Sequence, residues 1–287
     1  MKYLITWLKL HFILSIASQL GMWLSIVLVY CLITWLVLDL TGFHINELGT
    51  EASLINTIIL SLLMGFRNRT AYDRWWEGRR LWGQLVNDSR NLAAKWFAYL
   101  PPDELKNTRA VELLTAFPFS LKKHLRKDTY RLQDFPGLEG ETAMPAHIPA
   151  YIAKHLHQQA ALWLREGKIN EFMFRNMDLH LNGLLDVCGA CERIDNTPIP
   201  FSYKAMLRTG LFLHLLIAPW YTISYLGWKG IPVLLLVCFF LMGIEMIDSH
   251  IEDPFGHDED DLDLERYAHT IRDNVIQICS SYRTPNN

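Results

Sequence analysis

The feature that most limits how this chain can fold is a long apolar run, from Phe12 to Leu38, that contains no charged side chain. A helix rises about 1.5 Å per residue, so this run exceeds the roughly 20 residues needed to cross a hydrocarbon core of about 30 Å. It is too long for the apolar region of a secretory signal, so we expect it to be retained. A second uncharged run, from Thr209 to Trp228, is also long enough and ends in aromatic residues typical of a membrane interface.

Two shorter apolar runs accompany these predicted spans. Residues 52–66 and residues 231–244 are each bounded by charged side chains. Each run covers only about 21 to 23 Å as a helix, and its polar continuation is typical of a helix that faces protein or water on one side. We therefore expect four membrane spans in two hairpins, with the spans of the first hairpin at about 18–40 and 51–66.

Basic residues predict the orientation of the spans. Five arginines follow the second span closely, whereas residues 39–51 contain no Lys or Arg. Positive charge accumulates on the cytoplasmic side of a membrane, so we expect the middle of the chain to be cytoplasmic. An even number of spans then leaves both termini cytoplasmic, in a multi-pass protein of the cell inner (plasma) membrane. The five arginines are Arg67, Arg69, Arg74, Arg79 and Arg80.

The polar middle of the chain is too long for a linker, and its pattern is mainly helical. Pro101-Pro102-Asp103 is a helix-start signal, residues 168–193 carry apolar side chains at helical spacing, and Pro198-Ile199-Pro200 separates this part from the third span. The predicted fold is thus all-α, a membrane protein with four transmembrane helices and a cytoplasmic helical domain. The predicted segments are a membrane hairpin at 1–66, the cytoplasmic domain at 67–206, a second hairpin at 207–250, and a cytoplasmic acidic turn with a C-terminal helix at 251–287.

Charge and reactive residues exclude several classes of function. A net charge of -3 provides no basic field for nucleic acid. The five cysteines are odd in number, and Cys188-x-x-Cys191 lacks a second pair, so we expect free, buried thiols. His155-x-His157 and the other histidines show no metal spacing along a helix. Nucleotide-binding loops, hydrolase motifs and zinc-enzyme motifs are absent from the sequence, so we do not expect an enzyme.

Three separated motifs resemble the bestrophin family of ion channels in its prokaryotic form. The first is GFRNRTAYDRWWEGRRLWG at residues 65–83, the second is CGACERI at 188–194 followed by TPIPFSY at 197–203, and the third is IEDPFG at 251–256. The resemblance extends over roughly residues 21–272, and the topology of that family matches the four expected spans. It implies a homopentamer around a central pore that conducts small ions. In the first motif, Arg74, Trp75, Trp76 and Glu77 are expected to have structural roles.

The resemblance also implies which residues line the pore. In bestrophins the second span lines a narrow apolar neck, and this role falls on Ile58, Leu62 and Phe66. Their spacing of four residues places them on one helix face, where each would form an apolar ring that can exclude water. Ile59 and Leu63 offer an equally apolar alternative face. A second, cytoplasmic aperture is implied near Phe172 or Met173, positions that are equally compatible with a helix core.

The acidic turn after the fourth span is a candidate calcium site. Clustered carboxylates and backbone carbonyls suit a hard cation, and animal bestrophins that respond to calcium bind it at this turn. The resemblance implies Asp253, Asp258 and Asp261 as ligands, together with the carbonyl of His250. The alternative is that these acidic side chains cap the helix that follows, where its dipole favours negative charge.

Three functions remain open on the sequence alone. The first is a passive channel for monovalent ions, chloride by analogy with animal bestrophins, with a cation such as sodium as the alternative. The second is a membrane enzyme whose catalytic groups would lie among Glu245, Asp248 and His250. The third is a membrane scaffold that does not conduct. The expected partners are further copies of the chain, membrane lipid and small ions.

Overall fold

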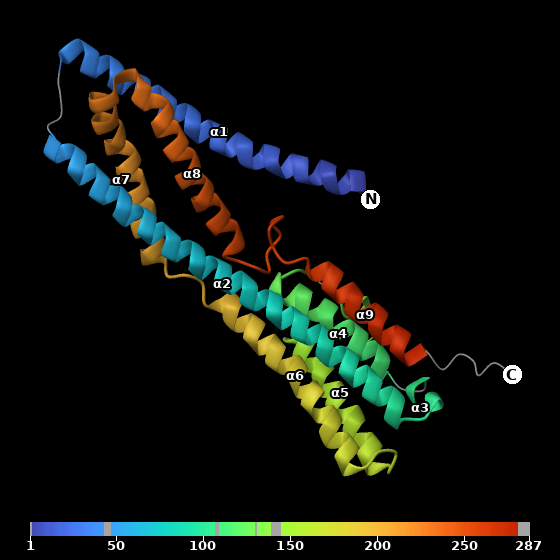
Figure 1. Ribbon diagram of the computed structural model, residues 1–287. Helices are drawn as coiled ribbons and strands as arrows, with labels where there is room; N and C mark the ends of the chain where they lie inside the picture. The colour runs from blue at the N-terminus through green and yellow to red at the C-terminus, as the bar shows by residue number, and fades with distance from the viewer. Residues whose placement is uncertain (1, 43–46, 107–108, 130, 139–144, 281–287) are drawn as a thin grey trace. The chain divides into compact units, whose positions relative to one another are not determined.

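A computed structural model describes residues 2–42, 47–106, 109–129, 131–138 and 145–280. The secondary structure of these residues is helical, without a strand (Figure 1). The α-helices are α1 (Lys2–Thr41), α2 (Glu47–Tyr99), α3 (Pro102–Lys106), α4 (Ala110–Leu125), α5 (Ile148–Arg165), α6 (Glu171–Asn196), α7 (Phe201–Leu226), α8 (Gly230–Ile251) and α9 (Leu264–Ser280). Two short 3₁₀ turns, η1 (Leu132–Asp134) and η2 (Gly227–Lys229), complete the order. The predicted all-α fold is confirmed.

The longest helix, α2, runs without a break from the apolar run into the polar part of the chain. The sequence pattern sets a boundary at residue 66, where the charges begin, but the helix continues to Tyr99. No Pro interrupts it, and Ala, Leu and Arg, which favour helices, are frequent in its polar part. A change from apolar to polar residues therefore marks a change of environment along one helix.

The chain divides into two compact units. The first unit comprises Met1–Asp73 and Ile199–Glu252, and contains α1, the beginning of α2, α7 and α8. The second unit comprises Arg74–Pro198 and Asp253–Asn287, and contains the rest of α2, α3 to α6, and α9.

The core of the first unit joins α1 to the hairpin of α7 and α8. Apolar side chains from all three helices pack together, among them Cys31, Ile223 and Cys238. A polar contact supports this packing, because the Trp220 indole N–H donates to the Tyr30 hydroxyl at 2.8 Å and that hydroxyl donates to a backbone carbonyl of α7, also at 2.8 Å. These contacts hold α1 against the hairpin.

The outer surface of the first unit is apolar. Ile33 in α1, Phe212 in α7 and Phe240 in α8 are all more than half exposed. Soluble proteins rarely expose large apolar patches of this kind. Two stretches of the described residues, Ser18–Thr41 and Phe201–Ile251, are long and apolar enough to form membrane-crossing helices, and each contains an 18-residue window of high mean hydropathy, 2.2 in the first and 2.4 in the second. The second stretch covers α7, η2 and α8. The count of four spans stays a prediction.

The second unit has a large apolar core of its own. Trp82 and Trp96 from α2, Phe117 from α4 and Trp163 from α5 are fully buried in it. Trp96 and Trp163 meet edge to face, with ring centroids 5.8 Å apart, a geometry that aromatic quadrupoles favour. The Trp163 indole N–H also donates to the Glu104 carboxylate at 3.0 Å. This core fixes the arrangement of the helices in the second unit.

The parts of the three resemblance motifs that belong to the second unit lie close together. Arg74 donates to the carbonyl oxygens of Ile194 at 2.8 Å and Thr197 at 2.5 Å, and so satisfies carbonyls at the end of α6 that have no partner within the helix. The Trp75 indole N–H donates to the Asp260 carbonyl at 2.9 Å. At Gly78 an added Cβ would lie 3.1 Å from the Phe255 ring. The first motif therefore contacts both the end of α6 and the acidic turn.

Candidate pore-lining site

The predicted neck residues form an exposed stripe on α2. Ile58 is 68% exposed, Leu62 is 58% exposed and Phe66 is 55% exposed. Successive residues of a helix are about 100° apart, so side chains four residues apart follow one another along nearly the same line. The stripe is therefore available for contacts outside the protomer.

The opposite side of α2 is buried in the first unit. Leu60 is 4% exposed and Met64 is 2% exposed, and both pack against Leu211 of α7 and Leu241 of α8. Each of these two buried residues lies about 160° around the helix axis from Leu62. The packing of the protomer itself thus turns the neck stripe outward.

The alternative apolar face of α2 is only partly free. Ile59 is 52% exposed, but Leu63 is half-buried. The face of Ile58, Leu62 and Phe66 is therefore the more uniformly exposed of the two. Its role as the pore neck remains a prediction.

A charged cluster fixes α2 next to the stripe. Arg67 is 1% exposed, and its guanidinium contacts the Glu245 carboxylate of α8. Arg208 of α7 donates from Nε to the same carboxylate at 2.7 Å, so two cations share one anion. Asn68 donates to Asp248 at 2.8 Å. Burial of an unpaired charge costs desolvation free energy, especially in a unit with an apolar exterior. Each charge in this cluster therefore needs a partner of opposite charge or a hydrogen bond.

These contacts bear on the enzyme hypothesis. Glu245 and Asp248, two of the three candidate catalytic groups, are engaged by Arg67, Arg208 and Asn68. Pairing with arginine is therefore the visible role of Glu245, and a hydrogen bond from Asn68 is that of Asp248. No local pattern in the sequence indicated which acidic residue Arg67 would meet.

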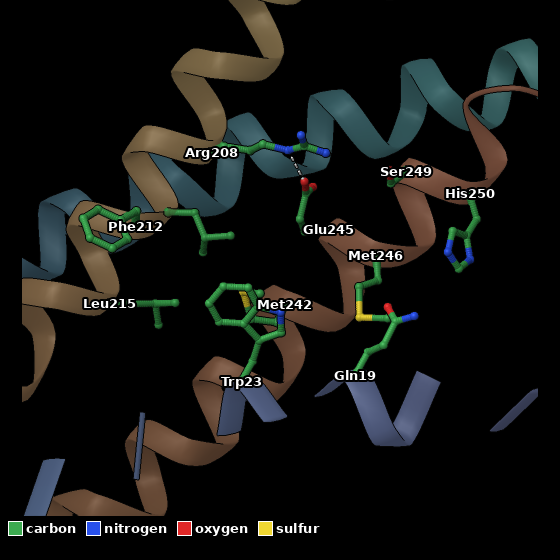
Figure 2. A pocket seen from close by; sticks show the side chains of 11 residues that line it. Gln19, Trp23, Arg208, Phe212, Leu215, Met242, Glu245, Met246, Ser249 and His250 are labelled. Carbon is green, nitrogen blue, oxygen red and sulfur yellow. Dashed lines mark hydrogen bonds and ion pairs between the residues drawn. The ribbon is translucent and has the colours of Figure 1, made fainter. Parts of the chain in front are cut away.

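A pocket of about 380 Å³ lies among α1, α7 and α8, within the first unit (Figure 2). The Arg208 and Glu245 side chains point toward each other along one edge of it, Phe212 and Leu215 lie at one end, and His250 lies at the other. Its walls are mostly apolar, with one ion pair at the side. Such a pocket can accept an apolar body such as a lipid chain. His250 is thus placed in the last turn of α8, at this pocket.

The two candidate aperture residues differ in environment. Phe172 is 80% exposed at the start of α6. Met173 is half-buried and packs against the core of the second unit, and its backbone N–H is capped by the Asn170 side chain at 2.9 Å. Phe172 is therefore the one whose side chain is free to line an opening.

The acidic turn brings two of its predicted calcium ligands close together. At Gly256 an added Cβ would lie 2.7 Å from Asp261 Oδ2 and 3.4 Å from Asp253 Oδ2, so glycine permits both carboxylates to approach the backbone. Asp261 Oδ2 accepts the backbone N–H of Asp258 at 2.6 Å. The described side chains do not gather three carboxylates here within metal-binding distance. Calcium at this turn stays a prediction.

Burial raises the pKa of the Asp261 carboxyl to about 7. The negative charges of Asp258 and Asp253 add to this effect, while the hydrogen bond from the Asp258 backbone opposes it. Asp261 Oδ1 is buried and has no hydrogen-bond donor among the described residues. A proton or a cation can satisfy this oxygen.

The cysteines are free, as the sequence predicts. Cys31, Cys188, Cys191 and Cys238 are buried, and Cys279 is half-buried. Burial raises the pKa of the Cys188 thiol to about 12, with the Glu192 charge as a lesser cause. A buried thiol of this kind is inert rather than redox-active.

Comparison with known proteins gives the family of the chain. The family described as Bacterial/Fungal Bestrophin protein matches residues 2–277. The voltage-dependent anion channel-forming protein alr2987 of Nostoc sp. is 35% identical over 240 residues, which are 79% of this chain and 77% of that protein. The protein of the same description, YneE, from Escherichia coli is 28% identical over 232 residues, which are 79% of this chain and 76% of that protein.

Solved structures agree with these relatives. A mutant of a bacterial bestrophin homologue from Klebsiella pneumoniae matches with a TM-score of 0.80 and 25% identity, covering 92% of this chain and 98% of that one. The relatives carry the names of channel-forming proteins rather than enzymes, in agreement with the prediction that this chain is not an enzyme. The chain belongs to the bacterial and fungal bestrophin family.

Proposed function

We propose that the chain is one subunit of a homopentameric channel that conducts small anions passively, with α2 lining the pore. The observation that carries this proposal is the apolar stripe of Ile58, Leu62 and Phe66, exposed on the side of α2 opposite its buried face. In a symmetric assembly each of these residues forms a ring. Water and ions leave a narrow apolar ring unless it widens, so such rings can act as a gate.

The continuation of the stripe favours a pore over a lipid contact. Arg69 lies about 20° from the direction of Leu62 around the helix axis, and so does Asp73. Their side chains are 83% and 68% exposed, with the Arg69 Nε 3.9 Å from Asp73 Oδ2. One helix line thus changes from apolar rings to exposed charges, as expected of a constriction that opens into a wet vestibule.

The preference for anions rests on the relatives. Apolar rings carry no charge sign, and in the first unit Arg67 and Arg208 are balanced in number by Glu245 and Asp248. The relatives in Nostoc and Escherichia coli are named as anion channel-forming proteins. We therefore propose chloride as the conducted ion, with sodium as the alternative that the experiment must distinguish.

The proposed topology has four spans with both termini in the cytoplasm, in the cell inner membrane. The apolar exterior of α1, α7 and α8 supports membrane insertion of the first unit. Residues 67–206 and 251–287 would form the cytoplasmic part. Within it, Phe172 of each subunit would contribute to the cytoplasmic aperture, while Met173 would pack behind it.

Purified protein in liposomes tests this function. The mass of the complex is measured first, and a pentamer is expected. A gradient of sodium chloride across the liposome membrane should then give a reversal potential near that of chloride. A reversal potential near that of sodium would show that the channel conducts cations instead of anions. A pentamer without flux would favour the scaffold, and a conducting monomer would exclude the symmetric pore.

A further inference from the structure

Three side chains from different helices of the second unit converge at one point. His124 lies in the last turn of α4, His147 is the N-cap of α5, and Glu192 lies in α6. Both histidines direct Nε2 at the same carboxylate oxygen, Glu192 Oε1, at 2.7 Å from His124 and 2.6 Å from His147. The two imidazole rings lie 4.4 Å apart between centroids. Among the described residues this is the one group of three that could hold a metal ion.

The kinds of ligand in this cluster define the kind of ion. Imidazole nitrogen suits zinc and its transition-metal neighbours, whereas calcium and magnesium prefer oxygen ligands alone. Two histidines and a glutamate are a known zinc-binding set that leaves a fourth position open. The cluster therefore differs in chemistry from the acidic turn of Asp253, Asp258 and Asp261.

The geometry is close to that of a filled site. Zinc binds nitrogen and carboxylate oxygen at about 2.0 to 2.2 Å, so neighbouring ligand atoms of a tetrahedral site are about 3.3 Å apart. The two nitrogen-to-oxygen distances here are 2.7 and 2.6 Å. The three side chains are half-exposed and can rotate. Rotations that move the histidine nitrogens roughly half an ångström farther from the Glu192 oxygen would make room for the ion.

The cluster borders a cavity of about 340 Å³ that gives an ion access. His124 and Glu192 line it, so a water molecule from this cavity can take the fourth position. The lysines around the cavity are paired and do not oppose a cation with free charge: Lys123 lies 2.9 Å from Asp134 and Lys127 lies 3.1 Å from Asp195.

A hydrogen-bond network without metal is the competing explanation, and His147 shows how the two differ. His147 Nδ1 accepts the backbone N–H of Ala150 at 3.1 Å, as an N-cap does. Nε2 must then carry the proton and donate it to Glu192. A metal at Nε2 requires that proton to move to Nδ1, so the ion replaces one cap hydrogen bond, a small loss beside the strength of metal–ligand bonds.

We propose that His124, His147 and Glu192 bind one divalent transition-metal ion, of which Zn²⁺ is the representative, and that this ion ties α4, α5 and α6 together. The proposal does not depend on the ion that the pore conducts. Its effect is on the second unit, where bound metal stabilises the folded state by an amount that grows with the logarithm of the free metal concentration divided by Kd.

Calorimetric titration of the full-length protein with zinc chloride, after removal of metal with a chelator, tests the site. The unaltered protein should bind one tight equivalent per chain, and excess calcium should not displace it. Three variants remove one ligand each: His124→Ala, His147→Asn and Glu192→Gln. Each should bind zinc at least 100-fold more weakly, because even partners outside the ligand shell affect metal affinity by about 10- to 100-fold. Asparagine is a good N-cap, so His147→Asn removes the ligand and retains the start of α5.

His269→Ala is the matched control. His269 Nε2 also faces a carboxylate, Glu265 Oε1 at 3.0 Å, but the metal-binding group of described residues does not include this pair. The control should bind zinc as the unaltered protein does. Three results would each overturn the proposal. They are the absence of saturable zinc binding, ligand variants that bind zinc as tightly as the unaltered protein, and a control variant that loses as much zinc affinity as the ligand variants. Thermal unfolding without metal identifies any variant that is simply misfolded. If His124→Ala or Glu192→Gln is misfolded, the zinc affinity of His147→Asn, which retains the N-cap of α5, decides whether the site exists.

Discussion

Leu62 and Met64 are two residues apart on α2, yet Leu62 is 58% exposed and Met64 is 2% exposed. The difference arises because Met64 packs against Leu211 and Leu241 of the protomer, while Leu62 points about 160° away from it around the helix axis. One helix thus has one face that is buried by folding and another that folding leaves exposed. Mutations on the two faces should have separable effects.

Leu62→Ala should increase ion flux through the reconstituted protein. Removing a bulky side chain from every subunit widens one apolar ring and lowers the cost of keeping it wet. Flux into liposomes is measured at matched amounts of protein. Met64→Ala is the control, and should reduce stability by about 2 to 5 kcal/mol through a buried cavity, with flux per folded complex unchanged. Increased flux in Met64→Ala together with unchanged flux in Leu62→Ala would show that the neck face is assigned incorrectly.

Phe172→Ala should also increase flux, because removing this side chain from every subunit widens the proposed cytoplasmic aperture. Phe172 is 80% exposed at the start of α6, so its truncation should change stability by less than about 0.5 kcal/mol. Met173→Ala, at the neighbouring position, is the control. Met173 packs against the core, so its truncation should lower stability more than it changes conductance. Single-channel recordings of both variants make the comparison, and a larger conductance in Met173→Ala alone would reverse the assignment.

Glu245→Ala should destabilise the protein strongly. Arg67 is 1% exposed and contacts Glu245, so the substitution leaves a buried cation without its anion, at a cost of about 3 to 5 kcal/mol. Asp73→Ala is the comparison, because the pair of Arg69 and Asp73 is exposed and its loss should change stability by about 1 kcal/mol or less. Unfolding in detergent is followed for both variants, and equal effects would contradict a structural role for the buried pair.

Asp261→Asn should stabilise the protein above pH 7 and have little effect near pH 4. The folded pKa of Asp261 is about 7, above its ordinary value of 3.8, so between these values the folded state holds a proton that the unfolded state has released. The free energy of unfolding then falls as pH rises through this interval, and the asparagine variant avoids that loss. Thermal unfolding across the pH range measures the difference.

The same variant tests calcium at the acidic turn. A bound cation would offset the buried charge of Asp261, so calcium at pH 8 should raise the unfolding temperature of the unaltered protein and not that of Asp261→Asn. The double variant Asp258→Ala with Asp261→Ala should lose calcium affinity in calorimetry. An unchanged affinity in the double variant would exclude this turn as the calcium site.

The sequence predicted the helical fold and the family because both depend on local features. An uncharged run such as 12–38 identifies an apolar helix wherever it lies in the fold. The motif around Arg74, Trp75 and Gly78 consists of residues that are close together in the chain, so it can be recognised without the tertiary structure. The exposure of Ile58, Leu62 and Phe66 also agrees with their spacing. The sequence did not indicate how far α2 extends beyond residue 66, which the structure sets at Tyr99, because a change in polarity does not mark the end of a helix.

What the sequence determined by itself is therefore the composition of the helices and the faces they can present. The tertiary structure alone decided which face of α2 is buried, which anion pairs with Arg67, and that His124, His147 and Glu192 meet. These three outcomes depend on side chains that are far apart in the chain and come together only when helices pack. Local spacing carries no information about such contacts, because packing energy is shared among many distant residues.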